Sequence, residues 1–389
     1  MASEDPLISR IGHALPWLAR YPAARARALF AANGSGPKHL IFCIANHFEP
    51  SWNGTELYDI DTQRRRLDNW CETARETGEA VTDADGTMFR HTNFYPAEQY
   101  ERGLLETLAD LQRAGLGEVE VHLHHGVDTP DTEEGLRRQL VEFRDRLAGD
   151  HGLLSRLDGS GDPMYAFVHG NWALGNSAGG QFCGVDNELA ILNETGCYAD
   201  MTLPSAPDRS QVPVLNSIYQ CALPMEHRAA HGRADHLKKG GGEPKLPVII
   251  TGPLMFDWTS GTRGLPLPKI ENGELASHRP IDMARVRRWI RANITVEGRP
   301  DWIFIKLHCH GFFDHDRSAC IGEDARRFFS EIIEHGEGTG KYKVHFATAR
   351  EMFNMVMAAV DGREGPPGDY RDYRLRQIMT QPMAVPVRA

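Results

Sequence analysis

Three histidines lie close together in the segment Glu118–Gly126, which reads EVEVHLHHG. The alternating residues before them predict a short strand, in which every second side chain projects from the same face. His122 and His124 are therefore expected to project together, while His125 begins the following loop and can turn back. Imidazoles spaced in this way can bind one divalent ion at about 2.0–2.1 Å. The segment predicts a metal site at a strand end, and the simpler alternative is a polar strand edge with incidental histidines.

A second group follows an apolar run near the N-terminus, in Asn46–Trp52 (NHFEPSW). If His47 and Glu49 share one face at i and i+2, they offer an imidazole and a carboxylate together. Such a pair supplies a metal ligand and either a second ligand or a general base. Standing alone, the motif would favour an exposed loop carboxylate beside a capping histidine.

A third group ends the apolar run Ile305–Gly311 (IKLHCHG). His308 and His310 are again expected on one face of a strand. His308, at the end of the strand, is our candidate for an acid or base in catalysis. His310 either orients it, contacts substrate or lies in a solvated loop.

The run Val168–Asn176 (VHGNWALGN) offers candidate substrate-binding residues. Its glycines permit close approach of the backbone to a ligand. Trp172 can serve as a stacking platform for a sugar, although burial in the core is the commoner fate of a tryptophan. We include His169 and Asn171 with Trp172 and His310 in the predicted substrate-binding set.

The elements that must position these groups are short β-rich runs that alternate with amphipathic segments. This alternation predicts parallel βα units with right-handed crossovers, and seven or eight such units predict a closed (β/α)7–8 barrel. The histidine-rich ends would then share one rim, where barrel active sites lie. The β-rich runs are 39–46, 87–94, 118–124, 164–169, 197–201, 247–251, 302–308 and 342–346.

The chain divides into three parts on this interpretation. Residues 1–36 form a helical arm, residues 37–360 form the barrel, and residues 361–389 form a tail rich in Pro, Gly and Arg. Residues 203–246 form a long irregular insertion that is expected to overhang the site, because loops of that length tend to be functional. The arm packs either on the barrel or on a second subunit of a homo-oligomer, and the sequence does not choose.

Composition excludes several classes of protein. The 389 residues carry a formal charge of −10, with 41% hydrophobic and 25% charged residues, as in globular proteins. No basic field attracts nucleic acid or an anionic membrane. The 7 cysteines do not form a disulfide pattern. The chain has no leader-like start and no run of 18 apolar residues, so we expect a cytoplasmic protein without membrane insertion.

Over residues 37–355, the order of motifs resembles the NodB-type polysaccharide deacetylase superfamily. The family's E-[IV]-x-x-H strand is matched by Glu118–His122, and its late L-x-x-L-H-like strand is matched by Ile305–His308. Thr92–Phe94 is similar to the family's T-F-F strand, and Phe346–Met352 is similar to its closing strand and helix. The resemblance implies a metal-dependent deacetylase on a partly closed (β/α)7 barrel, with His122 as a metal ligand and His308 as the catalytic acid.

The chain departs from this family at two places. The aspartate pair of the family is replaced by Asn46–Glu49, so Glu49 is the leading candidate for the base and Asp128 is the reserve. The family's second histidine falls where this chain has Gly126, so His124 or His125 must serve as that ligand.

The predicted reaction is hydrolysis of an N- or O-acetyl group on a sugar or glycan precursor. We expect a divalent ion, with Zn²⁺ as the first candidate, and a small-molecule or glycan substrate. The alternatives are a glycosidase of a related barrel type, which needs two carboxylates, and a non-catalytic barrel that binds sugar or metal. A metallo-β-lactamase fold is disfavoured by the βα alternation. The predicted metal ligands are His47, Glu49, His122 and His124 or His125.

Overall fold

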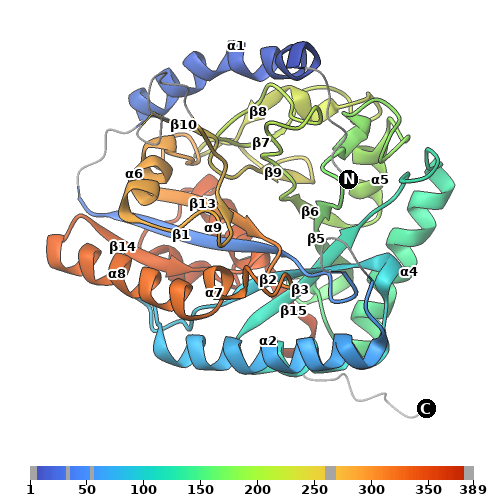
Figure 1. The fold of residues 1–389 in the computed structure, drawn as a ribbon. Coiled ribbons are helices and arrows are strands. Elements are labelled where there is room, and N and C mark those ends of the chain that lie inside the picture. The colour runs from blue at the N-terminus through green and yellow to red at the C-terminus, as the bar shows by residue number, and fades with distance from the viewer. Residues whose placement is uncertain (1–6, 32–35, 53–56, 259–268, 381–389) are drawn as a thin grey trace.

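The computed structural model describes most of the chain (Figure 1). The described residues are 7–31, 36–52, 57–258 and 269–380. Residues 1–6 and 32–35 of the expected arm, and residues 381–389 of the expected tail, lie outside them.

Each of the eight β-rich runs contains a strand, and these strands pair in parallel. They are β1 (Lys38–His47), β2 (His91–Pro96), β3 (Gly117–Leu123), β5 (Ser160–His169), β6 (Cys197–Asp200), β9 (Val248–Ile250), β13 (Trp302–Cys309) and β14 (Tyr342–Phe346). Shorter strands complete a 13-stranded sheet: β4 (Ser155–Leu157), β7 (Ile218–Cys221), β8 (Ala234–His236), β12 (Glu274–Leu275) and β15 (Leu375–Gln377). A separate antiparallel pair consists of β10 (Met255–Asp257) and β11 (Lys269–Glu271).

The sheet curls into a half-barrel. Its main path runs β12-β13-β1-β2-β3-β5-β6-β9-β7-β8, and within the described residues no ladder joins β8 back to β12. The two strands beyond β9 run antiparallel to their neighbours, so they extend the edge of the sheet and do not close it. The α/β class is therefore confirmed, and the barrel is an open one.

The helices lie on both faces of the curled sheet (Figure 1). Alternate residues of β1 separate the two faces: Leu40, Phe42 and Ile44 join a cluster with apolar residues of α2, α3, α4 and α8. Ile41 and the next alternate residues join a second cluster with α9. We call these the outer and inner faces. The helices are α2 (Ile60–Ala80), α3 (Arg102–Arg113), α4 (Glu133–His151), α5 (Glu188–Glu194), α6 (Met283–Ala292), α7 (Arg317–Cys320), α8 (Glu323–Thr339) and α9 (Ala349–Val360).

Helix α9 fills the inner face. It begins with a capping box, in which the Thr348 side chain accepts from the Glu351 amide and the Glu351 side chain accepts from the Thr348 amide. All of its residues are buried, and it contacts β1, β5 and β6. A helix that is apolar nearly all round and has no exposed face is typical of a domain core.

The first and last described segments of the chain pack on the half-barrel. The arm is one helix, α1 (Leu7–Ala31), in which Trp17 and Ala24 pack against Leu215 and Leu254. The described part of the expected tail is also folded, because β15 pairs with β4 and Arg371 forms an ion pair with Asp83 at 3.0 Å. The sequence interpretation of residues 361–380 as a tail is corrected by these contacts.

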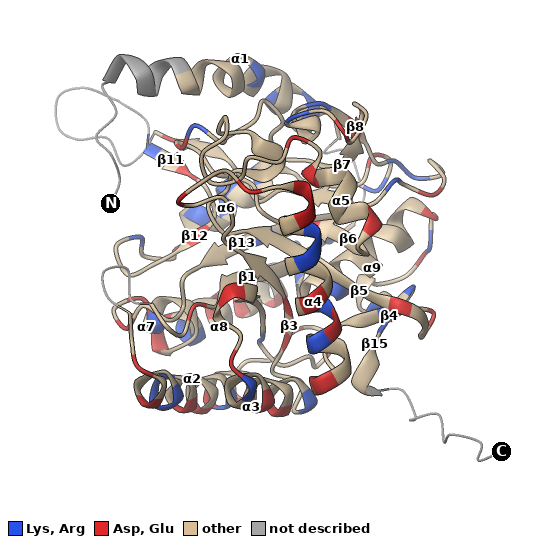
Figure 2. Cartoon of the chain, turned by 90° about the vertical axis from the view of Figure 1, so that its right-hand side faces the viewer, with Lys and Arg blue, Asp and Glu red and all other residues tan. Residues whose placement is uncertain are grey.

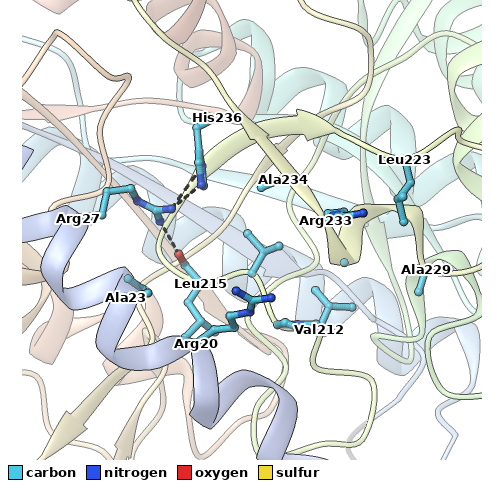
Figure 3. Close-up of a pocket in the computed structure, with 14 residues that line it drawn as sticks. Arg20, Ala23, Arg27, Val212, Leu215, Leu223, Ala229, Arg233, Ala234 and His236 are labelled. Atoms are coloured by element: carbon cyan, nitrogen blue, oxygen red, sulfur yellow. Dashed lines mark hydrogen bonds between the residues drawn. The ribbon is translucent and has the colours of Figure 1, made fainter.

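The insertion lies between α1 and the loop that follows β5. Together with α1 it lines an open cavity of about 780 Å³ (Figure 3). Beside this cavity, Arg27 donates to the backbone oxygens of Leu215 and Asn216 at 3.0 and 3.1 Å. At the other side, the Ala229 amide donates to the Gly175 oxygen at 2.6 Å. The insertion therefore covers the loop after β5.

Acidic and basic residues alternate over the outward faces of α2, α3 and α4 (Figure 2). No single-sign field covers these helices in this view. In the part of the chain that the structure describes, no helix is long and apolar enough to cross a bilayer.

Candidate metal centre at the strand ends

The carboxyl ends of β1 and β3 bring four side chains together, which we call the rim cluster: His47, Glu49, His122 and His124. Parallel pairing through β2 aligns the two ends, with Phe94 opposite His47 and Pro96 opposite His122. One oxygen, Glu49 Oε1, lies 3.2 Å from His122 Nε2 and 3.0 Å from His124 Nε2. The donor atoms of His47, Glu49 and His122 all lie within 4.8 Å of one another.

Hydrogen bonds to the far ring nitrogens orient the imidazoles of His122, in β3, and His124, just after it. His122 Nδ1 lies 2.9 Å from the Val168 oxygen, and a carbonyl only accepts, so Nδ1 carries the proton. His124 Nδ1 lies 2.5 Å from Glu98 Oε1, and because a carboxylate oxygen accepts, this Nδ1 also carries the proton. In the neutral rings the Nε2 lone pairs therefore face Glu49, an arrangement common among metal-bound histidines.

The Glu49 carboxylate and the Nε2 lone pairs of His122 and His124 face one another, so a positive charge between them would stabilise the rim cluster. Burial opposes ionisation of Glu49, but its contacts with His122 and His124 hold its pKa far below the usual range. Burial also disfavours a charged His124, but Glu49 and Glu98 on either side raise its pKa to about 10. A proton or a metal ion must therefore neutralise the carboxylate, which is only 3% exposed.

The residues present fit a divalent ion of the zinc class. His47 Nδ1 and Glu49 Oε2 are buried atoms without a hydrogen-bond partner. Ligands about 2.0 Å from a tetrahedral ion lie about 3.3 Å apart, close to the separations of Glu49 from the two imidazoles. Imidazole nitrogens with one glutamate are a frequent ligand set of catalytic zinc, and His124, which is 20% exposed, leaves the site open to solvent.

The two late histidines lie beside the rim cluster. His310 has its ring centroid 4.7 Å from that of His47 and stacks on Phe313 at 5.3 Å. His308 is buried in β13 opposite Ala45, and its Nδ1 has no hydrogen-bond partner. Burial, then the charge of Lys306, holds the pKa of His308 well below its ordinary value, so this ring is neutral at pH 7.

Asp128, the reserve base, lies elsewhere. It is exposed, and in the described structure no hydrogen bond or ion pair joins it to the rim cluster. Asn46 has a structural contact: its Oδ1 accepts from the Gly311 amide at 2.9 Å and so holds the loop after β13. Of the two candidate bases, only Glu49 is positioned at the rim.

His124 and His125, the two alternatives for the second ligand of β3, turn to opposite sides of the sheet. His124 contacts Glu49, whereas His125 turns to the outer face, where its Nε2 lies 3.1 Å from Glu188 Oε1. His169, predicted to bind substrate, also lies on the outer face and is fully buried near Glu188. The burial of His169 removes it from the set of residues that a substrate can reach.

The other predicted substrate-binding residues follow β5. Trp172 is partly exposed and has a left-handed backbone (φ 58°), an unusual conformation for a bulky residue that often marks functional sites. Asn171 Nδ2 is buried and has no hydrogen-bond partner. Both follow Gly170, whose backbone packs directly on the ring of His124.

Sequence reasoning missed Glu98, which orients His124, and Glu188 and Cys183 on the outer face. Glu98 lies in the turn η1 (Ala97–Gln99) after β2, and nothing in its local pattern marks a functional carboxylate. Glu188 begins α5 and is fully buried, which only the packing of the loop before it reveals.

Gly170→Ala is expected to weaken metal binding at the rim by about 10- to 100-fold, the usual effect of disturbing a residue that supports a ligand. A Cβ at Gly170 would lie 2.3 Å from His124 Cδ2, so the ring must move away from Glu49. Competition with a fluorescent zinc chelator measures the affinity.

Gly149→Ala in α4 is the matched control, because a Cβ there meets nothing within 4 Å. Its metal affinity should equal that of the unmodified protein. Equal affinity of the Gly170 variant and this control would contradict a role for His124 as a ligand.

Comparison with known proteins identifies no family. No family model matches the chain, and no curated protein matches it. Among solved structures, the chain is similar to a GH57 branching enzyme from the hyperthermophilic archaeon Thermococcus kodakaraensis, determined in complex with glucose and additives. The identity is 11%, the match covers 85% of this chain and 70% of that chain, and the TM-score is 0.30. A likeness at that level supports no conclusion about this chain, so the resemblance to NodB-type deacetylases rests on the motifs alone.

Proposed function

We propose that the protein is a metal-dependent hydrolase that removes an acetyl group from an N- or O-acetylated sugar or glycan precursor. The observation that carries the proposal is the buried Glu49 carboxylate, whose Oε1 faces the Nε2 atoms of His122 and His124 at 3.2 and 3.0 Å. The NodB-like motifs at His122 and His308 supply the class of reaction.

In this proposal the rim cluster holds a Zn²⁺-class ion. Such an ion lowers the pKa of bound water to about 7 and polarises a carbonyl oxygen. Glu98 and the Val168 carbonyl keep the His124 and His122 rings in the tautomer that binding requires.

The remaining groups move protons and position the substrate. Glu49 Oε2, buried and without a partner, is available to accept a proton from the attacking water. His308 is neutral, so it would relay to the leaving amine or alkoxide the proton that Glu49 takes from the water. Trp172, which is partly exposed at the end of β5, offers an aromatic face to the sugar, whereas the Nδ2 atom of its neighbour Asn171 is buried.

The test is an assay of acetate release from a panel of N- and O-acetylated amino sugars and their oligomers. Acetate should appear with added Zn²⁺, stop after chelation and return when Zn²⁺ is restored. Release that continues after complete removal of metal would contradict the metal-dependent step, and a panel that yields no acetate at all would contradict the proposal.

A glycosidase is the second candidate, because Glu49 and Glu98 both contact His124 and so place two carboxylates on either side of one ring. A glycosidase needs one carboxylic acid with a raised pKa, whereas the contacts of Glu49 hold its pKa low against the effect of burial. Release of reducing sugar without acetate from the same panel would favour this candidate over the deacetylase.

A further inference from the structure

Four buried side chains that are not needed by the proposed reaction meet on the outer face of the sheet: His125, His169, Cys183 and Glu188. Their candidate donor atoms all lie within 4.8 Å of one another. His125 follows β3, His169 ends β5, Cys183 lies in the irregular loop after β5, and Glu188 begins α5. We call this group the outer cluster.

The separations within the outer cluster approach those of ligands of one tetrahedral ion, with Glu188 facing the imidazoles through Oε1 and the thiol through Oε2. Glu188 Oε1 lies 3.1 Å from His125 Nε2 and 3.8 Å from His169 Nε2, and Glu188 Oε2 lies 3.4 Å from Cys183 Sγ. Nitrogen, oxygen and sulfur ligands at about 2.0–2.3 Å from a tetrahedral ion are about 3.3–3.7 Å apart. Two imidazoles, a thiolate and a carboxylate together are ligand types that zinc prefers.

Neighbouring groups hold these side chains as the outer shell of a metal site does. Asp131 Oδ2 lies 3.2 Å from His125 Nδ1 and is itself bonded by Gln139 Nε2 at 2.9 Å. The Gly175 amide donates to Glu188 Oε2 at 2.6 Å. A carboxylate on the far nitrogen of a histidine fixes the tautomer whose other nitrogen binds metal.

Hydrogen bonding alone leaves the outer cluster incomplete. His169 Nε2 has no hydrogen-bond partner although the residue is fully buried. Such an atom is costly unless a ligand satisfies it. If His169 binds the ion through Nε2, its ring proton lies on Nδ1. The 3.2 Å hydrogen bond that the Asn171 backbone N–H donates to Nδ1 is then lost, so His169 is the weakest of the four ligands.

A Cys–His–Asp nucleophile is the other chemistry that these residue types suggest. Cys183, His125 and Asp131 form such a series, since His125 also contacts the Cys183 thiol. Cys183 is 0% exposed, so no substrate carbonyl can reach its sulfur. Full burial distinguishes the outer cluster from the rim cluster, where His124 is 20% exposed.

We propose that His125, His169, Cys183 and Glu188 bind a structural Zn²⁺-class ion that is separate from the rim site. Structural zinc sites are closed by four protein ligands, whereas catalytic sites keep an open position. The ion would fasten the loop between β5 and α5, in which Trp172 and Phe182 have left-handed backbones, to the end of β3. The proposal does not depend on the function proposed for the rim.

The experiment is metal analysis of the full chain purified with Zn²⁺, comparing the unmodified protein with Cys183→Ala, Cys197→Ala and His122→Ala. Cys197 is the matched control, because it is equally buried and its thiol donates to the Ala199 oxygen. Cys183→Ala should lose one ion per chain, and Cys197→Ala should lose none. His122→Ala should keep the outer ion.

X-ray absorption at the zinc edge identifies the ligand atoms of zinc in the unmodified protein. This measurement needs no cysteine variant, so it tests the proposal even if Cys183→Ala does not fold. The unmodified protein and His122→Ala should both show a sulfur ligand to zinc. Absence of sulfur from the zinc shell, or an unchanged zinc content in folded Cys183→Ala, would overturn the proposal. If His122→Ala leaves the zinc content unchanged while the sulfur ligand is present, the rim proposal fails and the outer site stands.

Discussion

Glu49→Gln is expected to reduce the rate of acetate release by at least about 10²-fold, the lower end of what a positioned acid or base contributes. Glutamine preserves the size of the side chain but removes the charge that faces His122 and His124. Steady-state kinetics with the best acetylated substrate of the panel measures the loss, and circular dichroism checks the fold.

Metal analysis of the same variant assigns the role of Glu49. A protein that keeps its rim ion but loses activity identifies a base, whereas loss of the ion identifies a ligand. Glu106→Gln on α3 is the control, because that carboxylate is 56% exposed and pairs only at the surface. An unchanged kcat/KM in Glu49→Gln would remove the residue from the mechanism.

Arg350→Leu is expected to reduce the free energy of unfolding by about 3–5 kcal/mol, the usual effect of breaking a buried ion pair. Arg350 donates from Nε and Nη2 to Glu118 at 3.0 and 2.8 Å, and from Nη1 to the Leu375 oxygen at 2.8 Å. The substitution leaves Glu118 buried and without its guanidinium partner. Urea denaturation followed by tryptophan fluorescence measures the change.

Two comparisons make this prediction specific. The double variant Glu118→Leu/Arg350→Leu should recover part of the loss, because no unpaired charge then remains in the core. Arg102→Leu removes a surface pair, with side chains 64% and 56% exposed, and should change stability little. A single variant as stable as the unmodified protein would show that the pair does not stabilise the fold.

The order of elements was predictable because parallel strands carry a strong local signal. The apolar runs 39–46 and 302–308, for example, correspond to β1 and β13, and the predicted bounds differ from the observed ones by one or two residues at most. The open edge was not predictable, because β7 and β8 lie in an irregular insertion with little apolar alternation. The folded segment around Arg371 was missed for a related reason: its ion pair with Asp83 joins residues far apart in sequence.

The candidate site was predictable where residue spacing alone fixes direction. Positions i and i+2 of a strand face the same side, so His122 and His124 meet, and His47 comes to them through strand pairing. The direction of His125 was not predictable, because it follows the strand and its partner Glu188 is distant in sequence. The role of each ligand stays a prediction until metal analysis is done.

The buried helix α9 has a consequence for how a long substrate would approach. Helix α9 is buried throughout and packs on the inner face of the described sheet against β1, β5 and β6, so it fills the space beside these strands. If the proposed function holds, a polymeric substrate would approach the rim cluster from the side on which His124 is 20% exposed. Internal units of such a polymer would then be as accessible as its ends.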